Sequence, residues 1–418
     1  NSLSDIGGYG LYCGDGDSSL VSNNSLQNIG GTAFYLNQGA GSTISSNTVF
    51  DAYVGVHIND GQGVALLSND LDVINYRGMD IRNNPTYCTI EENNISNVNS
   101  SDGININGMA DECSISYNTF SDINDYAVMI SSYAREAEFV GNTVTNTGYG
   151  FHIGSSVNNT LFSQNTIEDI NSGAGDAFYI GGHGAGALFD SNTITDVPSY
   201  GIYISEDAEG AIFSNNMLTN IGRGVRMLYS ADVQFTSNTL TGILLGDAFE
   251  SRSMRNGLIQ DNVFSSVSTS AISINNESGQ NSENIVITDN SINDVGNYGI
   301  FINDDGENIE ITGNSITDTQ NKCLYINSGN HDQSNISDNL FISSASSSET
   351  DHVVYIQYAH GGIFENNIID GSDNSDIGLY ISYTNNFSIS GNVIKNNNTG
   401  INTLFLNIDS DTTENTIS

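Results

Sequence analysis

A short phrase of apolar and polar positions recurs along the whole chain. Its template is an apolar residue, any two residues, an asparagine, any residue and a second apolar residue. The asparagines that fit it are Asn24, Asn47, Asn69, Asn93, Asn118, Asn142, Asn165, Asn192, Asn216, Asn238, Asn262, Asn290, Asn314, Asn339, Asn367 and Asn392. Successive asparagines are 22 to 28 residues apart, and Asn1 and Asn415 fit the same phase with part of the template missing or altered. About seventeen such steps fill the chain, and a period of this length is typical of solenoids.

Alternating apolar positions within each repeat predict three short β-strands. One pattern, apolar–any–apolar, precedes the asparagine, as at 285–287. Another begins about nine residues after the asparagine with Gly or Ala, as at 201–204, and a shorter apolar pair such as Ile194 and Val197 lies between them. Alternation with a period of two is typical of strands, and no window shows helical periodicity. Three short strands cannot bury a core alone, but stacked repeats can.

The repeated asparagine phrase, followed by Gly–apolar–any–apolar, resembles the right-handed parallel β-helix. This is the fold of pectate lyases, polygalacturonases, phage tail spikes and the NosD-like repeat proteins. The resemblance covers essentially the whole chain and implies an all-β solenoid of about seventeen coils with an asparagine ladder. We expect residues 1–418 to form one solenoid with no separate second domain. The resemblance is specific for fold and not for function.

Stacking explains the residue types. Coils of such a solenoid lie ~4.8 Å apart, so each side chain meets its equivalent in the next coil. We expect the asparagines to stack in a ladder at a corner, in the left-handed backbone region that Asn and Gly tolerate best. Cys88 and Cys113 both lie five residues before a ladder asparagine, so they should be neighbours. They could form a disulfide or remain two stacked free thiols, whereas Cys13 and Cys323 are too far apart to meet.

Both ends of the chain continue the repeat without a polar or helical cap. Solenoids usually shield their terminal coils because an open end is a row of unpaired strand edges. We therefore expect a chain that is uncapped at both ends, either as a segment of a longer protein or as a subunit that abuts copies of itself.

Net charge limits the partners. The chain has 9 Lys and Arg against 49 Asp and Glu, a formal charge of −40, which excludes nucleic acid and anionic membrane surfaces as favoured partners. No apolar stretch is long enough for membrane insertion. Eight N-x-S/T sequons permit glycosylation, at Asn23, Asn94, Asn99, Asn158, Asn276, Asn335, Asn386 and Asn397. We expect an extracellular or cell-surface location.

Catalytic candidates are few. Gly182-His183-Gly184 resembles the Gly-His-Gly element of polygalacturonases, but the Asn-Thr-Asp and Arg-Ile-Lys elements of that family are missing. Arg226 should lie beside Glu250 of the next coil, which predicts either a salt bridge between coils or a catalytic or anion-binding patch for a uronate chain. We expect no catalytic set and keep Arg226, Glu250 and His183 as fallback candidates.

Two other features could bind ligands. Acidic turns, with Asp304 and Asp305 as the candidates, could hold Ca²⁺, although none has the spacing of a calcium loop and no other cofactor is expected. The middle residue of Gly–apolar–any–apolar should face outward, and it is aromatic in many repeats. Its members Tyr179, Tyr203, Tyr325, Tyr355 and Tyr380 could contact sugar rings or another copy of the chain, or serve only as good strand residues.

The leading hypothesis is an extracellular structural or adhesive protein that self-associates, such as a fibre, sheath, surface-layer or stalk component. Two alternatives stay open. One is a polysaccharide lyase, hydrolase or epimerase acting on uronic-acid polymers, and the other is a non-catalytic carbohydrate-binding spike. Chain cleavage would distinguish the first alternative, and binding without turnover the second.

Overall fold

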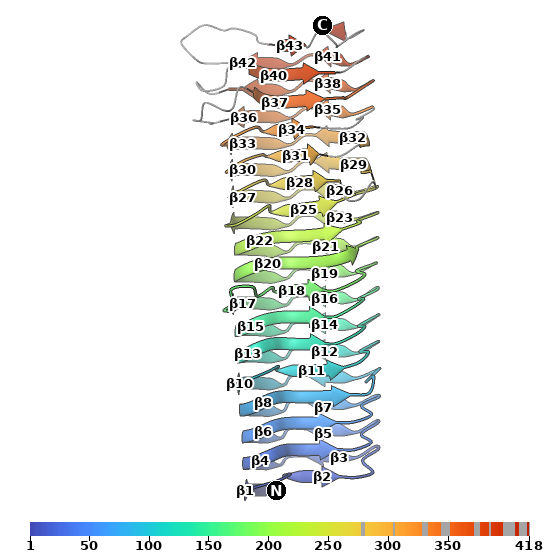
Figure 1. Ribbon diagram of the computed structural model, residues 1–418, viewed down its shortest axis with the longest axis vertical. Helices are drawn as coiled ribbons and strands as arrows, with labels where there is room; N and C mark the ends of the chain where they lie inside the picture. Colours follow the sequence, from blue (N-terminus) through green and yellow to red (C-terminus); the bar gives the residue numbers. More distant parts are fainter. Residues whose placement is uncertain are drawn as a thin grey trace. The chain divides into compact units, whose positions relative to one another are not determined.

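The computed structural model describes residues 1–276, 281–303, 306–327, 333–343, 352–371, 377–383, 386–395, 406–408 and 416–417. The regular secondary structure of this part is entirely β-strand. It divides into two compact units, which we name unit 1 (Asn1–Glu206) and unit 2 (Asp207–Ser418). Each unit is a stack of parallel turns (Figure 1). The predicted all-β parallel solenoid is confirmed, with about 15 turns, slightly fewer than the seventeen expected. One uninterrupted solenoid over residues 1–418 stays a prediction.

Each turn of unit 1 contains two kinds of strand. Short strands precede the ladder asparagine: β3 (Leu20–Ser22), β5 (Thr43–Ser45), β7 (Ala65–Leu67), β9 (Thr89–Glu91), β12 (Ser114–Ser116), β14 (Glu138–Val140), β16 (Leu161–Ser163) and β19 (Leu188–Asp190). Long strands follow it, either whole or as two pieces: β1 (Ser2–Ile6) with β2 (Leu11–Cys13), β4 (Ser25–Leu36), β6 (Thr48–Ile58), β8 (Asp70–Arg82), β10 (Asn94–Val98) with β11 (Ile104–Asn107), β13 (Thr119–Ile130), β15 (Thr143–Ile153), β17 (Thr166–Ile170) with β18 (Phe178–Ile180), and β20 (Thr193–Asp207).

Unit 2 repeats this arrangement. Its short strands are β21 (Ile212–Ser214), β23 (Gln234–Thr236), β26 (Leu258–Gln260), β29 (Glu283–Thr288), β32 (Glu307–Thr312), β35 (Asn335–Ser337), β38 (Ile363–Glu365), β41 (Ser388–Ser390) and β44 (Thr416–Ile417). Its long strands are β22 (Met217–Leu228), β24 (Thr239–Ile243) with β25 (Phe249–Arg252), β27 (Val263–Val267) with β28 (Ile272–Asn275), β30 (Ser291–Val295) with β31 (Ile300–Asn303), β33 (Ser315–Thr319) with β34 (Leu324–Ile326), β36 (Leu340–Ser343) with β37 (His352–Gln357), β39 (Ile368–Asp370) with β40 (Ile377–Ser382), and β42 (Val393–Lys395) with β43 (Leu406–Ile408).

The asparagine ladder is continuous within each unit, from Asn24 to Asn192 and from Asn216 to Asn392. Asn118 is typical of the buried ladder residues. Its Nδ2 donates to Oδ1 of Asn142 at 3.1 Å and to the carbonyl of Ile90 at 2.8 Å. Its Oδ1 accepts from Nδ2 and the backbone N–H of Asn93, at 2.9 and 3.0 Å. The amide therefore uses both donors and both acceptor positions.

The expected left-handed backbone at the ladder asparagine is wrong. The positive φ belongs to the residue just before it, as at Glu92 (57°), Tyr117 (57°) and Gly141 (66°). This residue makes the turn, and the asparagine that follows is then free to point its amide into the interior. Since a left-handed residue other than Gly costs roughly 1–2 kcal/mol, the ladder hydrogen bonds offset a recurring backbone strain.

The interior is built from columns of equivalent apolar side chains. In unit 1 the rings of Phe139, Phe162 and Phe189 stack at centroid distances of 4.9 and 4.6 Å. Burial of one such ring contributes roughly 1.5–3 kcal/mol. The Gly that precedes the second strand pattern is required by close packing, because a Cβ on Gly78 would lie 2.4 Å from the carbonyl oxygen of Gly103. The interpretation of these positions as tight corners is confirmed there.

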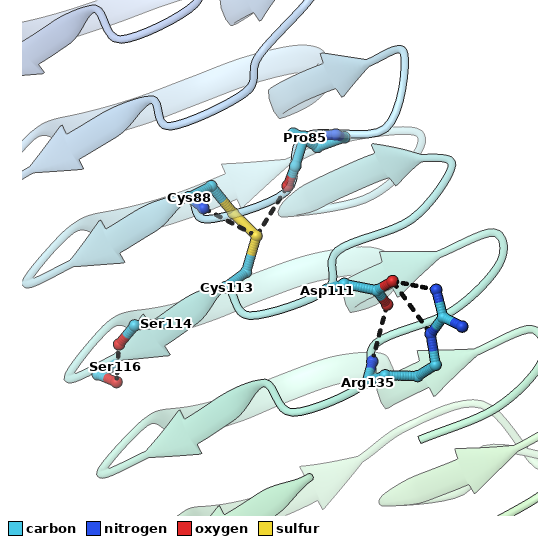
Figure 2. The surroundings of a disulfide bond; sticks show 7 residues. All are labelled: Pro85, Cys88, Asp111, Cys113, Ser114, Ser116 and Arg135. Atoms are coloured by element: carbon cyan, nitrogen blue, oxygen red, sulfur yellow. Dashed lines mark hydrogen bonds and ion pairs between the residues drawn. A yellow bond between two sulfur atoms is a disulfide. The ribbon is translucent and has the colours of Figure 1, made fainter. Parts of the chain in front are cut away.

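The predicted neighbourhood of Cys88 and Cys113 is also confirmed. Their Cα atoms are 4.5 Å apart, and the two residues form a disulfide that joins successive turns (Figure 2). An ion pair between Asp111 and Arg135 joins the next pair of turns beside it. The expectation that Cys13 and Cys323 do not pair agrees with their free thiols. Two successive turns of unit 1 are thus covalently linked.

Candidate functional site

Two columns of outward side chains follow the last part of the long strands. The central column consists of the middle residue of the Gly–apolar–any–apolar pattern in each turn, which stands between the two apolar positions. The leading column consists of the residue three positions before it in each turn. In unit 1 the central column is Tyr12, Tyr35, His57, Asp80, Asn105, Met129, His152, Tyr179 and Tyr203. The leading column is Tyr9, Thr32, Val54, Arg77, Asp102, Tyr126, Tyr149, Asp176 and Tyr200. Contacts such as Arg77–Asp80 and Tyr200–Tyr203 show that the two columns share one face.

Charged side chains occupy the middle of this face. We define the ion-pair cluster as His57, Arg77, Asp80, Arg82 and Asp102. Nδ1 of His57 lies 2.9 Å from Asp80, and Nη2 of Arg82 lies 2.7 Å from the same carboxylate. Arg77 bridges two turns, with Nη1 3.2 Å from Asp80 and Nε 3.3 Å from Asp102. The Asp80 side chain is only 2% exposed although it stands on the solvent side of its strand, whereas Arg82 is 43% exposed.

Two carboxyl groups of the cluster have opposite pKa shifts. Burial opposes the ionisation of Asp80, but hydrogen bonds from His57 and Arg82 outweigh it and hold the pKa of Asp80 below its usual value. Burial also acts on Asp102, and there it raises the pKa because the charge of Arg77 and the local hydrogen bonds offset only part of it. The ionised form of Asp80 is therefore favoured relative to an ordinary aspartate, whereas the ionised form of Asp102 is disfavoured.

Asp102 has a structural task that recurs on this face. Its carboxylate accepts hydrogen bonds from Asn105 at 3.1 Å and from the backbone of Tyr126 in the next turn. Asp176 accepts from the backbone N–H of Tyr200 at 2.9 Å in the same way. An Asp in the leading column thus links one turn to the next, and this structural role accounts for its burial without a catalytic one.

Aromatic side chains lie on both sides of the ion-pair cluster. On the N-terminal side, Tyr35 stacks on Tyr12 at 5.2 Å and on His57 at 4.7 Å. On the C-terminal side, Tyr126 stacks on Tyr149 at 4.6 Å. His152, Tyr179 and Tyr203 continue the series, with centroids 4.6 and 5.5 Å apart. Unit 1 therefore presents a charged centre flanked by aromatic rings.

Unit 2 has a related face of its own. Its central column is Arg226, Glu250, Ser273, Phe301, Tyr325, Tyr355 and Tyr380, and its leading column includes Arg223, Asp247, Ser270, Tyr298, Lys322 and His352. The predicted salt bridge between coils is present, since Nε of Arg226 lies 3.4 Å from Glu250. Arg252 contacts the same carboxylate at 3.2 Å. Asp247 ties turns together by accepting from Thr269 and from the backbone of Ser270.

Basic residues are concentrated on these faces. Four of the nine Lys and Arg residues belong to the two columns, namely Arg77, Arg223, Arg226 and Lys322, while Arg82 and Arg252 follow the central column by two residues. The columns also carry the outward aromatic side chains. In a chain with a formal charge of −40, each unit thus presents its cations together with its outward rings.

The other predicted site residues lie in two kinds of place. The strip residues Tyr179 and Tyr203 are register neighbours in unit 1, and Tyr325, Tyr355 and Tyr380 are successive neighbours in unit 2. His183 lies outside the two columns, in the exposed turn after β18, with Nε2 3.5 Å from Glu206. Within each unit the structure therefore brings the strip residues together, and in unit 1 it does not join His183 to them.

The glycosylation and calcium candidates have mixed positions. Five sequon asparagines are exposed, and they are Asn23, Asn94, Asn99, Asn276 and Asn386. Asn158 and Asn335 are half-buried. Asn397 and the calcium candidates Asp304 and Asp305 lie outside the described residues. Within the described ranges, no three His, Cys, Asp or Glu side chains gather as a metal site would require, and no helix there could cross a membrane.

Sequence reasoning missed the ion-pair cluster. The aromatic pattern of the central column does not indicate Asp80 and Asn105, because these two turns carry no ring at that position. The repeat position itself does indicate Asp80, because Asp80 and His57 occupy the same position of successive repeats. The signal was a charged residue in a column that is otherwise mostly aromatic.

Solved structures with similar architecture include proteins of bacteriophages and of the periplasm. The Dettilon tailspike protein is 15% identical over 79% of this chain and 62% of its own, with a TM-score of 0.44. A mutant tailspike protein of E. coli bacteriophage HK620, in complex with a pentasaccharide, is 10% identical over 90% of this chain and 73% of its own, with a TM-score of 0.45. The periplasmic alginate epimerase is 10% identical over 87% and 78%, with a TM-score of 0.35. This chain thus spans less than two thirds of the Dettilon protein.

No curated protein matches the sequence. The family described as right handed beta helix region matches residues 1–111, 102–243 and 176–341. These overlapping matches extend over residues 1–341, which is more than half of the chain. On this match, and with the parallel turns and asparagine ladder described above, the chain belongs to the right handed beta helix family.

Proposed function

We propose that the protein binds a polysaccharide along the outward face formed by the leading and central columns of unit 1. The observation that carries this proposal is the ion-pair cluster flanked by aromatic rings on one rigid sheet face. A sugar ring has an apolar face of C–H groups and an edge of hydroxyls. Aromatic side chains interact with the former, while fixed charged and amide groups bind the latter.

The arrangement of the rings gives them two ways to contact a sugar. In a parallel stack such as His152 with Tyr179 (15°), each ring covers its neighbour and offers a ligand its edge and polar atoms. In an edge-to-face pair such as Tyr179 with Tyr203 (75°), one ring keeps both of its faces clear of the other. Each of these two rings is also stacked on one side, Tyr179 on His152 and Tyr203 on Tyr200, so a sugar ring can stack only on a face that these contacts leave uncovered.

The ion-pair cluster supplies rigid polar contacts. Asp80 is held by three donors and cannot reorient without breaking them. Arg82, anchored to Asp80, has a side chain that is 43% exposed and can donate to sugar hydroxyls. Because the side chains are already ordered, binding costs little side-chain entropy.

The dimensions of the face suit a polymer. The central column extends from Tyr12 to Tyr203 over eight steps between turns, which corresponds to roughly 40 Å at the strand spacing of a parallel sheet. An extended chain can contact successive turns, whereas a small ligand would use only one or two of them.

The disulfide supports an oxidising location, because such bonds persist outside the cytosol. An extracellular or periplasmic setting is where free polysaccharide is met. The self-associating structural or adhesive role predicted from the sequence is compatible with this face, since a stalk or surface-layer component can also carry a glycan site. Self-association itself stays a prediction.

Affinity electrophoresis against a panel of neutral and acidic polysaccharides, followed by calorimetry on the best binder, tests the proposal. Tyr149→Ala and Tyr179→Ala should each weaken binding about tenfold, or ~1.4 kcal/mol. Tyr117→Asn is the matched control, because Tyr117 is exposed at a corner outside both columns. The proposal fails if no polysaccharide binds, or if the two column variants bind as tightly as the control.

One observation favours cleavage as a second candidate function. Asp125 lies next to the leading column, its side chain has no hydrogen-bond partner among the described residues, and burial together with the charge of Asp102 raises its pKa. Such a carboxyl group can serve as a general acid. The same incubations report it, since release of new chain ends that disappears in Asp125→Asn would establish catalysis. Binding without chain shortening would reject it.

A further inference from the structure

A shallow hollow opens on the outside of unit 1, at the corner between the two halves of the long strands. It has a volume of about 260 Å³ and spans four successive turns, which carry β10, β13, β15 and β17 (Figure 1). Six exposed amide or carboxylate side chains line it, and they are Asn97, Asn99, Asp122, Asn124, Asn146 and Asn171. The hollow is therefore a different kind of surface from the aromatic columns further along the same turns.

The repeat departs from its usual pattern at this hollow. In each turn one outward residue makes the corner with a positive φ, and a second outward residue follows two positions later. Both are Asn or Asp in two consecutive turns here, whereas earlier turns have Tyr53 or Val73 at one of the two positions. The next turn has Gly148 at the second position, where a Cβ would lie 2.5 Å from the carbonyl oxygen of Asn124. No side chain thus fills the space between Asn124 and Asn171.

Hydrogen bonds between turns fix most of the lining side chains. Nδ2 of Asn171 donates to Oδ1 of Asn146 at 2.9 Å, and Nδ2 of Asn146 donates to Oδ1 of Asp122. Nδ2 of Asn97 donates at 2.7 Å to a carboxylate oxygen of the preceding turn. The Asn124 amide, in contrast, has no hydrogen-bond partner among the described residues. The hollow therefore combines a fixed row of polar groups with one amide that is available to a ligand.

The chemistry of the hollow matches the hydroxyl groups of a neutral sugar. An amide donates and accepts on neighbouring atoms, and so do the adjacent hydroxyls of a sugar ring. Ca²⁺ is less suited, because it is bound by several oxygen ligands with more than one carboxylate among them. Asp122 is the single carboxylate among the described residues that line the hollow, and one of its oxygens already accepts from Asn146.

Other ligand classes find no complementary group in the hollow. Neither Lys or Arg nor an aromatic ring is among the described residues that line it, so an anion has no cation to pair with and a planar base has no ring to stack on. The volume is below the roughly 300–1,000 Å³ of pockets for drug-sized ligands. This size suits one sugar residue rather than a length of polymer.

We propose that the hollow binds one neutral sugar residue at the end or at a branch of a glycan. Asn124 supplies the unpartnered amide, and the row of Asp122, Asn146 and Asn171 supplies fixed acceptors with lone pairs to spare. The inference goes beyond the proposed function, because it assigns a second position at the corner of the turns. It holds whether or not a polymer binds the two columns.

Methyl glycosides of glucose, galactose and mannose are the probes, because a terminal or branching residue is also linked through its anomeric carbon. Saturation-transfer-difference NMR on the full chain should detect at least one of them with a Kd of about 1 mM. Asn124→Ala and Asn146→Ala should each weaken this binding about fivefold or more. Asn28→Ala is the matched control, because Asn28 is an exposed corner residue at the repeat position of Asn146 and donates to Asp5 at 2.9 Å.

The outcomes separate this site from the face of the two columns. Weaker binding in both hollow variants but not in Asn28→Ala supports the hollow. Binding of no glycoside, or equal binding by all variants, overturns it. Binding that is lost in Tyr179→Ala instead places the glycoside on the columns, which overturns the hollow and supports the proposed function. Binding that EDTA abolishes and Ca²⁺ restores identifies a cation site and overturns direct recognition.

The test does not depend on a variant that fails to fold. Asn124 makes no hydrogen bond among the described residues, so Asn124→Ala should keep the melting temperature of the wild type. Polymers that fail to bind the columns would overturn the proposed function and leave a glycoside bound in the hollow unexplained by it. The two proposals can thus fail separately.

Discussion

Replacement of Asp80 by Asn tests whether the ion-pair cluster is a single linked network. The change keeps the size of the side chain and one acceptor oxygen but removes the negative charge. Three donors then lose their anion, namely Nδ1 of His57 at 2.9 Å, Nη1 of Arg77 at 3.2 Å and Nη2 of Arg82 at 2.7 Å. Arg77 is the most affected because its side chain is only 19% exposed and it must keep its position beside Asp102.

The size of the effect follows from these contacts. Loss of a hydrogen bond to a charged group costs roughly 1.5–3 kcal/mol, and breaking a buried ion pair from one side costs about 3–5 kcal/mol. The Asn oxygen still accepts one bond, and Arg82 can turn to solvent. We therefore expect Asp80→Asn to lower the free energy of unfolding at pH 7 by about 3 kcal/mol. Asp70→Asn is the matched control, since Asp70 is exposed and accepts one bond from Asn94.

The effect should depend on pH in a defined direction. The folded pKa of Asp80 lies below its value in the unfolded chain, so its charge stabilises the protein above the unfolded pKa, near 4. This stabilisation is lost as the pH falls from there through the folded pKa. The difference between wild type and Asp80→Asn should thus be largest near pH 7 and shrink below about pH 4. Urea unfolding monitored by circular dichroism from pH 3 to 7 measures it. A difference that is constant over this range, or no larger than that of Asp70→Asn, would refute the reasoning.

Two further predictions concern the turns that carry the site. Asn118→Ala removes four buried hydrogen bonds and should lower the free energy of unfolding of unit 1 by about 4 kcal/mol in urea. Asn94→Ala loses one exposed hydrogen bond and should lower it by less than about 1 kcal/mol. Similar losses for the two variants would contradict the role of the ladder. Replacing Cys88 and Cys113 together by Ser should lower the unfolding free energy by about 3 kcal/mol, the scale for a loop of 25 residues, and reductant should then no longer affect stability. A melting temperature equal to that of the oxidised wild type would show that this disulfide adds nothing.

The repeat could be predicted from the sequence because its signal is multiplied by stacking. Each ladder asparagine must meet another one turn away, so the spacing of the asparagines gives the register of every strand directly. The same offset of five residues placed Cys88 against Cys113. The conformation of the corner could not be predicted in this way. The strained position varies in residue type, as Glu92, Tyr117 and Gly141 show, so it leaves no pattern in the sequence.

The candidate site could be predicted only where it follows the repeat. The aromatic strip was found because Tyr179 and Tyr203 share a position with other rings. The contact of Arg77 with Asp102 was not found, because it depends on how far a long side chain reaches across to the next turn. The position of a residue in the repeat predicts which residue lies beside it in the next turn. It does not predict the rotamer that forms an ion pair, because the rotamer depends on how the surrounding side chains pack.

Within the ion-pair cluster, Asp80 and its donors are a part of unit 1 that stacking does not require. Interior positions beside the central column stay apolar from turn to turn, as with Val56, Met79 and Ile104, because a polar residue there would be buried without partners. The outward position has no such constraint, and Tyr35 shows that a stacked ring serves the fold there. A buried ion pair is seldom a better source of stability than an apolar replacement of similar size, since desolvation offsets most of its attraction. Asp80 and its donors therefore carry a cost that folding alone does not explain, and an ordered set of polar groups between two aromatic stacks is what polysaccharide binding would gain from it.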